Sequence, residues 1–422
     1  MGFIIPLIPA LVVCRAFPVI NSFYFLGAVL LLTMFLFYFA LILKPNSNLS
    51  IVVTKKNTTK FLNTHLGKLF IYTGSFGLWA SLTSIWSPFP NVSITRGIYF
   101  IAISSGAILI GYLWKNDERN DMLGLLLPAN LVVILISLYS LMTSSPEDSW
   151  SGGHGLGFKG YATHQNALAS AIIFTFPAVI FPLINKLTQK STNRLEGKSS
   201  SSNFLDYKII FYILIAAINI YLLLISVSRA ALLTLSILFF VFILLNFKLK
   251  TILLVVPIII LASVISFRTI PEVKNFIFKT EQNIGDRRLI NIKETIKAAK
   301  IGGWTGIGYG ISATPSDTNV IGHYENNGKM FVREKMIGVL AIIEETGIIG
   351  LGLFILPFIF IGSTLFKKLK TSDEEKRIYI AFLIALIAAL CFHAQIEAWW
   401  VGVGSIELPL FFMILGLGVK KE

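Results

Sequence analysis

The chain of 422 residues is 55% hydrophobic and only 14% charged, and its mean hydropathy of +0.75 excludes a water-soluble globular protein. The formal net charge is +14, but most Lys and Arg residues lie in short segments between apolar runs, a pattern that is typical of membrane proteins. We therefore predict that the chain contacts membrane lipids and binds no nucleic acid.

Along the chain, apolar runs of about 18–25 residues recur, and a helix of that length crosses ~30 Å of hydrocarbon. Such helices satisfy their own backbone hydrogen bonds, so we predict an all-α fold, a polytopic transmembrane helical bundle of about twelve spans. The expected spans are 2–20, 22–43, 69–87, 94–114, 122–143, 167–185, 209–227, 230–247, 251–267, 337–366, 378–398 and 404–419.

Three parts follow from this pattern. Residues 1–267 hold transmembrane helices 1–9, residues 268–336 form one large loop, and residues 337–422 hold helices 10–12. Every second connection between spans is rich in Lys and Arg, as in 186–208 and 367–377, whereas the connections between them carry few basic residues. The positive-inside rule then places both termini in the cytoplasm and the large loop on the outer side.

The large loop is too long for a simple connection in a compact bundle, and loops of this length are often functional. It contains an expected amphipathic helix near 286–300, followed by the glycine-rich sequence GGWTGIGYG at 302–310. This glycine-rich sequence lacks the Lys and the strand–turn–helix context of a phosphate-binding loop. We interpret it as a tight turn.

Arginine side chains are the first candidates for chemistry. Arg229 lies between two expected spans in SVSRAALLTL, where a permanently charged guanidinium needs a partner. Phosphate is a natural one, because the guanidinium donates two parallel hydrogen bonds; the alternative is a residue that anchors the turn by snorkelling. Arg287 and Arg288 open the loop helix, where they could bind a second phosphate or form a solvated helix start.

Acidic and histidine side chains near the tenth span are the second group. His323 and Glu334 could act as a general base on a hydroxyl, or belong to an ordinary polar loop. Glu344 and Glu345 fall within the span, so they must pair, protonate or face the bundle interior. A salt bridge to an external Arg and proton coupling are the two alternatives for this pair.

The remaining polar residues give weaker indications. The histidines of the chain lack metal-ligand spacing, and we predict neither a metal nor another cofactor. Glu397 ends the eleventh span beside Trp399 and Trp400. The tryptophans fit an interfacial aromatic belt, although indole rings also stack on sugars.

Five segments together resemble one family. Between residues 70 and 418 the chain resembles the bacterial O-antigen ligase and O-antigen polymerase superfamily, which includes exopolysaccharide polymerases. The segments that carry the resemblance are LTSIWSPFPNVSITRGIYFI (82–101), GFKGYATHQNALAS (157–170), SVSRAALLTL (226–235), DRRLINIKETIKAAKIGGWTGIGYG (286–310) and EKMIGVLAIIEETGIIGLGLF (334–354).

The resemblance implies a metal-independent glycosyltransferase of a bacterial inner membrane with its active face in the periplasm. Such a protein transfers a glycan from an undecaprenyl-pyrophosphate carrier to a hydroxyl of a saccharide, lipid or protein acceptor. It implies that Arg229 and Arg287, or Arg288 in its place, bind the pyrophosphate. Apart from the resemblance, we expect Arg96, His164, Asn166 and Glu397 to bind the substrate.

One departure from the family pattern concerns the base. Ligases carry a His about eleven residues before the Gly of Glu-x-Gly, and Lys335 and Met336 occupy that place here. We therefore expect Glu334 or His323 as the catalytic base and polysaccharide polymerisation as the reaction, with ligase-type transfer to a lipid or protein acceptor as the alternative. A polysaccharide or lipid-linked substrate transporter, and a structural partner in an envelope assembly, are the alternatives of other classes.

Overall fold

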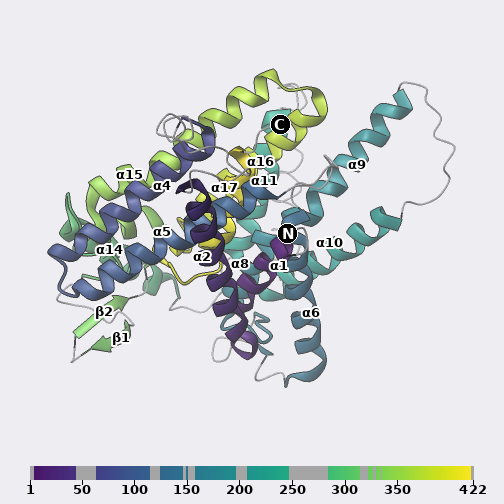
Figure 1. Ribbon diagram of the computed structural model, residues 1–422. Coiled ribbons are helices and arrows are strands. Elements are labelled where there is room, and N and C mark those ends of the chain that lie inside the picture. The colour runs from purple at the N-terminus through teal and green to yellow at the C-terminus, as the bar shows by residue number, and fades with distance from the viewer. Residues whose placement is uncertain are drawn as a thin grey trace.

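The structure is a computed structural model, and it describes residues 4–43, 63–114, 124–145, 149–150, 157–195, 207–246, 284–313, 322–326, 329–333 and 335–419. Within these residues it is a helical bundle with one short antiparallel hairpin (Figure 1). The predicted helical class is correct, whereas the hairpin is an element that the sequence did not indicate. The expected span 251–267 lies outside the described residues.

The elements follow one another with short breaks. The longer helices are α1 (Ile4–Val13), α2 (Ser22–Leu43), α4 (His65–Leu82), α5 (Pro90–Leu113), α6 (Leu127–Thr143), α8 (Gln165–Thr175), α9 (Pro177–Leu195), α10 (Tyr207–Ser226), α11 (Arg229–Asn246), α14 (Ile284–Gly302), α15 (Gly338–Thr371), α16 (Glu374–His393) and α17 (Glu407–Val419). Four single-turn helices are η1 (Cys14–Ala16), η2 (Pro18–Ile20), η3 (Thr83–Ile85) and η5 (Trp399–Val401). The hairpin pairs β1 (Gly322–Asn326) with β2 (Lys329–Arg333).

Seven helices of the described residues are long and apolar enough to cross a membrane: Pro90–Leu113, Gly124–Thr143, Gln165–Lys186, Tyr207–Ser226, Arg229–Asn246, Gly338–Thr371 and Lys376–His393. The expected span 167–185 is two helices in one line, α8 and α9, which meet at Phe176. The expected span 404–419 contains only the 13 residues of α17. The expected span 2–20 contains the ten residues of α1 and two single turns.

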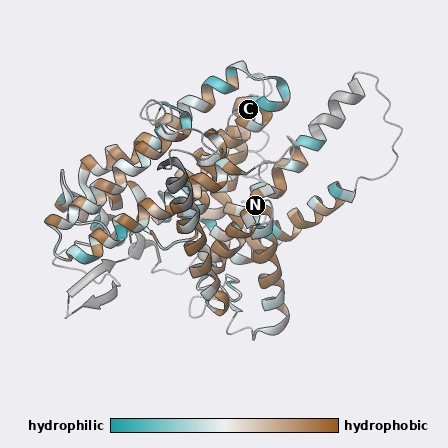
Figure 2. Cartoon of the chain, in the orientation of Figure 1, coloured by the Kyte–Doolittle hydropathy of each residue, from teal (hydrophilic) through white to brown (hydrophobic). Residues whose placement is uncertain are grey.

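The outer surface of the bundle is apolar. The spanning window of α10 has a mean hydropathy of 2.6, yet only 33% of it is buried inside the chain, and the corresponding share for α11 is 28%. Hydrophobic side chains therefore face outward, and Figure 2 shows apolar colouring along the outer helices. A soluble protein does not expose apolar surface on this scale, so these faces fit a lipid environment.

Short helix α17 lies at the centre of the bundle and is buried from Leu408 to Val419. It packs closely on α5 because both helices have a glycine where they cross. A Cβ on Gly111 would lie 2.0 Å from the carbonyl oxygen of Met413, and one on Gly416 would lie 2.2 Å from that of Ile108. Glycines at such crossings let two backbones approach, as in other membrane bundles.

A polar cluster joins three helices inside the bundle. The side-chain amides of Asn130 and Asn219 donate to each other's oxygens at 2.9 and 3.0 Å. Asn130 also donates to the hydroxyl of Thr175 at 3.0 Å. All three residues are fully buried, and such interhelical hydrogen bonds fix the relative positions of α6, α8 and α10.

Several helices start or finish at one end of the bundle, and local contacts connect them. The carbonyl of Ala16 accepts from the backbone N–H of Thr163, just before α8. The N–H of Phe158 donates to Ile225, in the last turn of α10, at 2.8 Å. The N–H of Gly338, at the start of α15, donates to Ala394, just after α16. The ends of α10 and α16 and the starts of α8 and α15 therefore meet there.

Candidate functional site

Helix α15 breaks at Gly347, which has φ 73° and ψ −178°. The glycine-rich segment after α14 packs into this break. We call residues 303–313 together with Lys335, Glu344 and Glu345 the glycine-loop junction. The positive φ values of Gly306, Gly308 and Gly310 let the segment turn there.

The junction exchanges backbone hydrogen bonds between the loop and the broken helix. The N–H groups of Ile348 and Ile349 donate to the carbonyls of Gly303 and Trp304 at 3.0 and 3.2 Å. In return, the N–H groups of Ile307 and Gly308 donate to the carbonyls of Glu344 and Glu345 at 3.1 and 3.0 Å. A helix break inside a membrane needs such partners, because no water satisfies the freed backbone groups. The glycine-rich sequence thus completes α15.

Two buried carboxylates and one ammonium group connect the junction. Glu345 Oε2 accepts from the N–H of Gly310 at 2.6 Å, and Glu344 Oε1 accepts from that of Ala313 at 2.8 Å. Lys335 Nζ forms an ion pair with Glu345 and lies 3.7 Å from Glu344 Oε2. Glu344 and Glu345 are 0% and 2% exposed. The expected pairing of these glutamates is confirmed, but their partner is Lys335 rather than an external Arg.

Arg96 also belongs to the junction. It lies in the second turn of α5, and its Nη1 lies 3.5 Å from the carbonyl oxygen of Gly310. A Cβ on Gly310 would come within 2.3 Å of the Arg96 side chain. Neighbouring Tyr309 is fully buried, and burial raises its pKa well above the ordinary value, with the charge of Glu345 adding to the effect. The phenol therefore stays neutral among charged neighbours.

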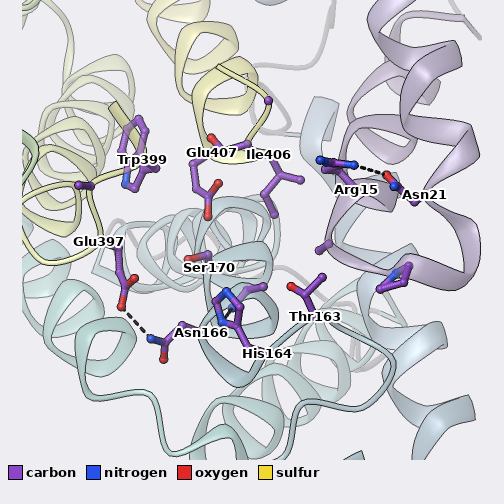
Figure 3. A pocket seen from close by; sticks show the side chains of 16 residues that line it. Arg15, Asn21, Thr163, His164, Asn166, Ser170, Glu397, Trp399, Ile406 and Glu407 are labelled. Carbon is purple, nitrogen blue, oxygen red and sulfur yellow. Dashed lines mark hydrogen bonds between the residues drawn. The ribbon is translucent and has the colours of Figure 1, made fainter. Parts of the chain in front are cut away.

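A separate cavity of about 500 Å³ opens at the end of the bundle where α8 and α17 begin. Figure 3 shows its side chains converging from α8, α17, the segment after α16 and the segment around η1 and η2. We call this cavity the polar pocket. It is lined by Arg15, Ala16, Pro18, Asn21, Thr163, His164, Asn166, Ala167, Ser170, Glu397, Ala398, Trp399, Gly404, Ser405, Ile406 and Glu407.

Three of the four predicted substrate-binding residues, His164, Asn166 and Glu397, line this pocket. Asn166 Nδ2 donates to Glu397 Oε1 at 2.8 Å, across 231 residues of sequence. His164 caps α8, because its Nδ1 accepts from the N–H of Ala167 at 3.1 Å. This acceptor role assigns the proton of the neutral imidazole to Nε2. Arg96, the fourth predicted contact, is not among the lining residues.

Two charged residues of the pocket are not among the candidates that the sequence indicated. Arg15 Nη1 donates to Asn21 Oδ1 at 3.1 Å, and its guanidinium lies 5.6 Å from the centre of the Tyr24 ring. Glu407 is the first residue of α17, and Figure 3 shows its carboxyl group pointing toward Ser170. Both residues stand at the edges of apolar runs, where a single charge indicates only a helix boundary.

Arg229 begins α11 beside this end of the bundle. The turn before it contains Val227, whose φ of 52° is unusual for a β-branched residue. Residues held in such a conformation occur preferentially at functional sites. A Cβ on Gly157 would lie 2.4 Å from the carbonyl oxygen of Ser226 and 1.7 Å from Gln165 Oε1. Helix α11, which begins at Arg229, three residues beyond Ser226, therefore starts close to the first turn of α8.

The tryptophan pair lies inside the protein. Trp399 and Trp400 are 5% and 4% exposed. Trp399 Nε1 donates to His393 Nδ1 at 3.1 Å, and the ring of Trp400 packs against Phe354 at 5.1 Å. The predicted interfacial belt is therefore wrong for these two residues, because an apolar run with aromatic residues at its end does not tell lipid-facing from core-facing positions.

The other predicted residues are described in part. Arg287 and Arg288 lie in the first turns of α14, and His323 lies in β1, where the structure describes their backbone. Glu334 lies outside the described residues. Among the residues that the structure does describe, no group of three or more His, Cys, Asp or Glu side chains could hold a metal ion.

No protein-family model matches the chain, and no curated protein matches it.

Proposed function

We propose that this protein transfers a glycan from an undecaprenyl-pyrophosphate carrier to an acceptor hydroxyl, and that the reaction lengthens a polysaccharide. One observation supports the proposal: the polar pocket gathers His164, Asn166 and Glu397, three of the four residues that we expected to bind the substrate. Imidazole, amide and carboxylate groups at a pocket wall are suited to the hydroxyl groups of sugars. Transfer to a lipid or protein acceptor is the variant of the same reaction.

The charge distribution supports a location in a bacterial inner membrane, with about twelve spans and the large loop on the periplasmic side. The Lys-rich connection between α15 and α16 lies at the opposite end of α16 from Glu397. Under the positive-inside rule that end faces the cytoplasm. The proposal accordingly puts the polar pocket and Arg229 on the periplasmic face and both termini in the cytoplasm.

The proposed reaction needs fixed positive charge, because the departing pyrophosphate gains negative charge in the transition state. Arg229, at the start of α11, supplies a guanidinium next to the pocket end, and Arg287 or Arg288 supplies another from α14. The apolar outer faces would hold the polyprenyl tail in the bilayer. Attack by the acceptor hydroxyl at the anomeric carbon then inverts its configuration in a single displacement.

The test uses purified protein in liposomes with a synthetic undecaprenyl-pyrophosphate oligosaccharide, and chain length is read by mass spectrometry. We expect wild type to lengthen the glycan. Arg229→Ala should lower the rate about 10²- to 10³-fold, as for other preorganised groups that stabilise developing charge. Asn166→Ala should lower it about tenfold or more, because it removes a hydrogen bond to a charged group.

Matched controls come from the opposite end of the bundle. Arg377 and Glu374 are exposed at the start of α16, and Arg377→Ala and Glu374→Gln should leave the rate unchanged. Movement of the intact carrier across the membrane without glycan elongation would support a transporter and contradict the proposal. Equal rates for Arg229→Ala and Arg377→Ala would remove Arg229 from the mechanism.

A further inference from the structure

The charged side chains of the polar pocket indicate whether it binds the donor or the acceptor of the proposed reaction. Its lining holds two carboxyl groups, Glu397 and Glu407, and one guanidinium, Arg15. The guanidinium already has an acceptor in Asn21 and an aromatic face in Tyr24. A cavity whose guanidinium already has these partners offers a pyrophosphate little positive charge, whereas its carboxyl groups can form hydrogen bonds with the hydroxyl groups of a neutral sugar.

We propose that the polar pocket is the acceptor subsite, which binds the uncharged end of a glycan, and that Glu407 takes the proton from its attacking hydroxyl. This inference rests on the proposed glycan transfer and assigns its two halves to different places. The neutral acceptor lies between α8 and α17. The carrier pyrophosphate lies outside the pocket, toward Arg229 at the start of α11.

Among the ionisable side chains of the pocket lining, we assign Glu407 as the base. His164 uses Nδ1 to accept from Ala167, so its neutral ring carries the proton on Nε2 and has no free nitrogen lone pair to act as a base. Glu397 has one oxygen bound by Asn166 at 2.8 Å, which fixes it as part of the wall. Glu407 is the other carboxyl group of the lining; it is the first residue of α17 and points toward Ser170.

The step balances as a single displacement. The acceptor oxygen gives an electron pair to the anomeric carbon of the donor while its proton passes to the Glu407 carboxylate. The bond between the anomeric carbon and the phosphate oxygen breaks, and its electron pair leaves with the undecaprenyl pyrophosphate. Glu407 then returns the proton to water, which restores the carboxylate for the next addition.

The test separates binding from turnover in full-length protein in lipid nanodiscs. The binding probe is the neutral oligosaccharide released from the synthetic carrier by mild acid, titrated by calorimetry, and inorganic pyrophosphate is the competitor. We expect the oligosaccharide to bind wild type without competition from pyrophosphate. Asn166→Ala should raise the Kd about tenfold, in line with the loss of a charge-assisted hydrogen bond.

Glu407→Gln keeps the size and polarity of the side chain but removes the base. It should change the Kd of the oligosaccharide less than about threefold and lower kcat about 10²- to 10⁴-fold, the usual contribution of general base catalysis. Glu374→Gln, at the other end of the bundle, should change neither. A folded Glu407→Gln protein that retains its kcat would overturn the assignment of the base.

Other outcomes overturn the subsite itself. Pyrophosphate that displaces the oligosaccharide from wild type would place the anionic donor in the pocket instead. A second outcome is that wild type elongates the glycan but Asn166→Ala binds the oligosaccharide with the same Kd as wild type. The acceptor would then bind elsewhere, and the proposed function would still hold. Absence of elongation by wild type, with the carrier bound intact, would remove the proposed function and this inference together.

Discussion

The glycine-loop junction and the polar pocket use the same residue types at the same end of the bundle, but their charges are arranged differently. In the junction, Lys335, Glu344 and Glu345 are buried and contact each other and the loop backbone. In the pocket, Arg15, Glu397 and Glu407 line an open cavity of about 500 Å³. Charges that contact only the protein interior hold the fold, whereas charges that line a cavity can also contact a ligand.

We expect the largest effect from substitution of Lys335, the buried cation of the glycine-loop junction. Replacing it by Met leaves two buried carboxylates without their cation, which costs about 3–5 kcal/mol for a buried pair that loses one partner. We expect Lys335→Met to lower the apparent melting temperature in detergent more than any of the substitutions in the polar pocket. Thermal unfolding followed by tryptophan fluorescence measures the effect.

The matched control is Lys300→Met, because Lys300 is exposed on α14. The double variant Lys335→Met/Glu345→Gln should recover part of the stability, since it removes one of the two buried negative charges. Equal melting temperatures for Lys335→Met and Lys300→Met would show that the buried ion pairs contribute nothing to the fold.

A second test of the junction uses two glycines of the same helix. A Cβ on Gly347 would lie 2.1 Å from the carbonyl oxygen of Trp304, at a φ of 73°, whereas one on Gly352 meets nothing within 4 Å. Gly347→Ala should therefore cost about 1–3 kcal/mol. Gly352→Ala should leave the melting temperature equal or higher, because Ala favours a helix. If both variants melt alike, the loop does not hold the kink.

The pocket should respond in function rather than in stability. Glu397→Gln keeps an oxygen that can accept from Asn166, but it loses the charge that faces the cavity. We expect an unchanged melting temperature and a roughly fivefold lower rate of glycan transfer, the difference between a charged and a neutral hydrogen bond. The measurement that checks this is the rate of glycan transfer per folded molecule. A melting temperature that falls as far as that of Gly347→Ala would show that Glu397 stabilises the fold instead.

The smallest expected effect concerns Arg96, which the sequence had grouped with the substrate-binding residues. Its guanidinium lies 3.5 Å from the carbonyl oxygen of Gly310 and is not part of the pocket lining. Arg96→Gln should lower the melting temperature slightly and leave transfer per folded molecule unchanged. A loss of transfer as large as that of Asn166→Ala would show that Arg96 contacts the substrate.

The sequence predicted the features that depend on local pattern. Apolar run length located most helices, and the amphipathic stretch at 286–300 is indeed part of α14. It could not predict the ion pair between Lys335 and Glu345, because the chain between them changes from an extended segment to a helix. It also missed Glu407 and Arg15, which lie far apart in the sequence and meet only after folding.

The sequence indicated His164, Asn166 and Glu397 separately as substrate-binding residues, but their common pocket required the tertiary structure. The hydrogen bond between Asn166 and Glu397 spans 231 residues, and no sequence period connects two such positions. The same limit explains Trp399 and Trp400, whose burial depends on neighbours from α8, α15 and α17.

The most direct measurement follows both products of wild type in liposomes that contain the synthetic carrier. Mass spectrometry would count the undecaprenyl pyrophosphate released, and NMR would give the anomeric configuration of each new linkage. Glycan transfer by direct displacement predicts one released carrier for each linkage formed, with inverted configuration. Retained configuration would contradict the single displacement, and an intact carrier that has crossed the membrane with no new linkage would contradict glycan transfer itself.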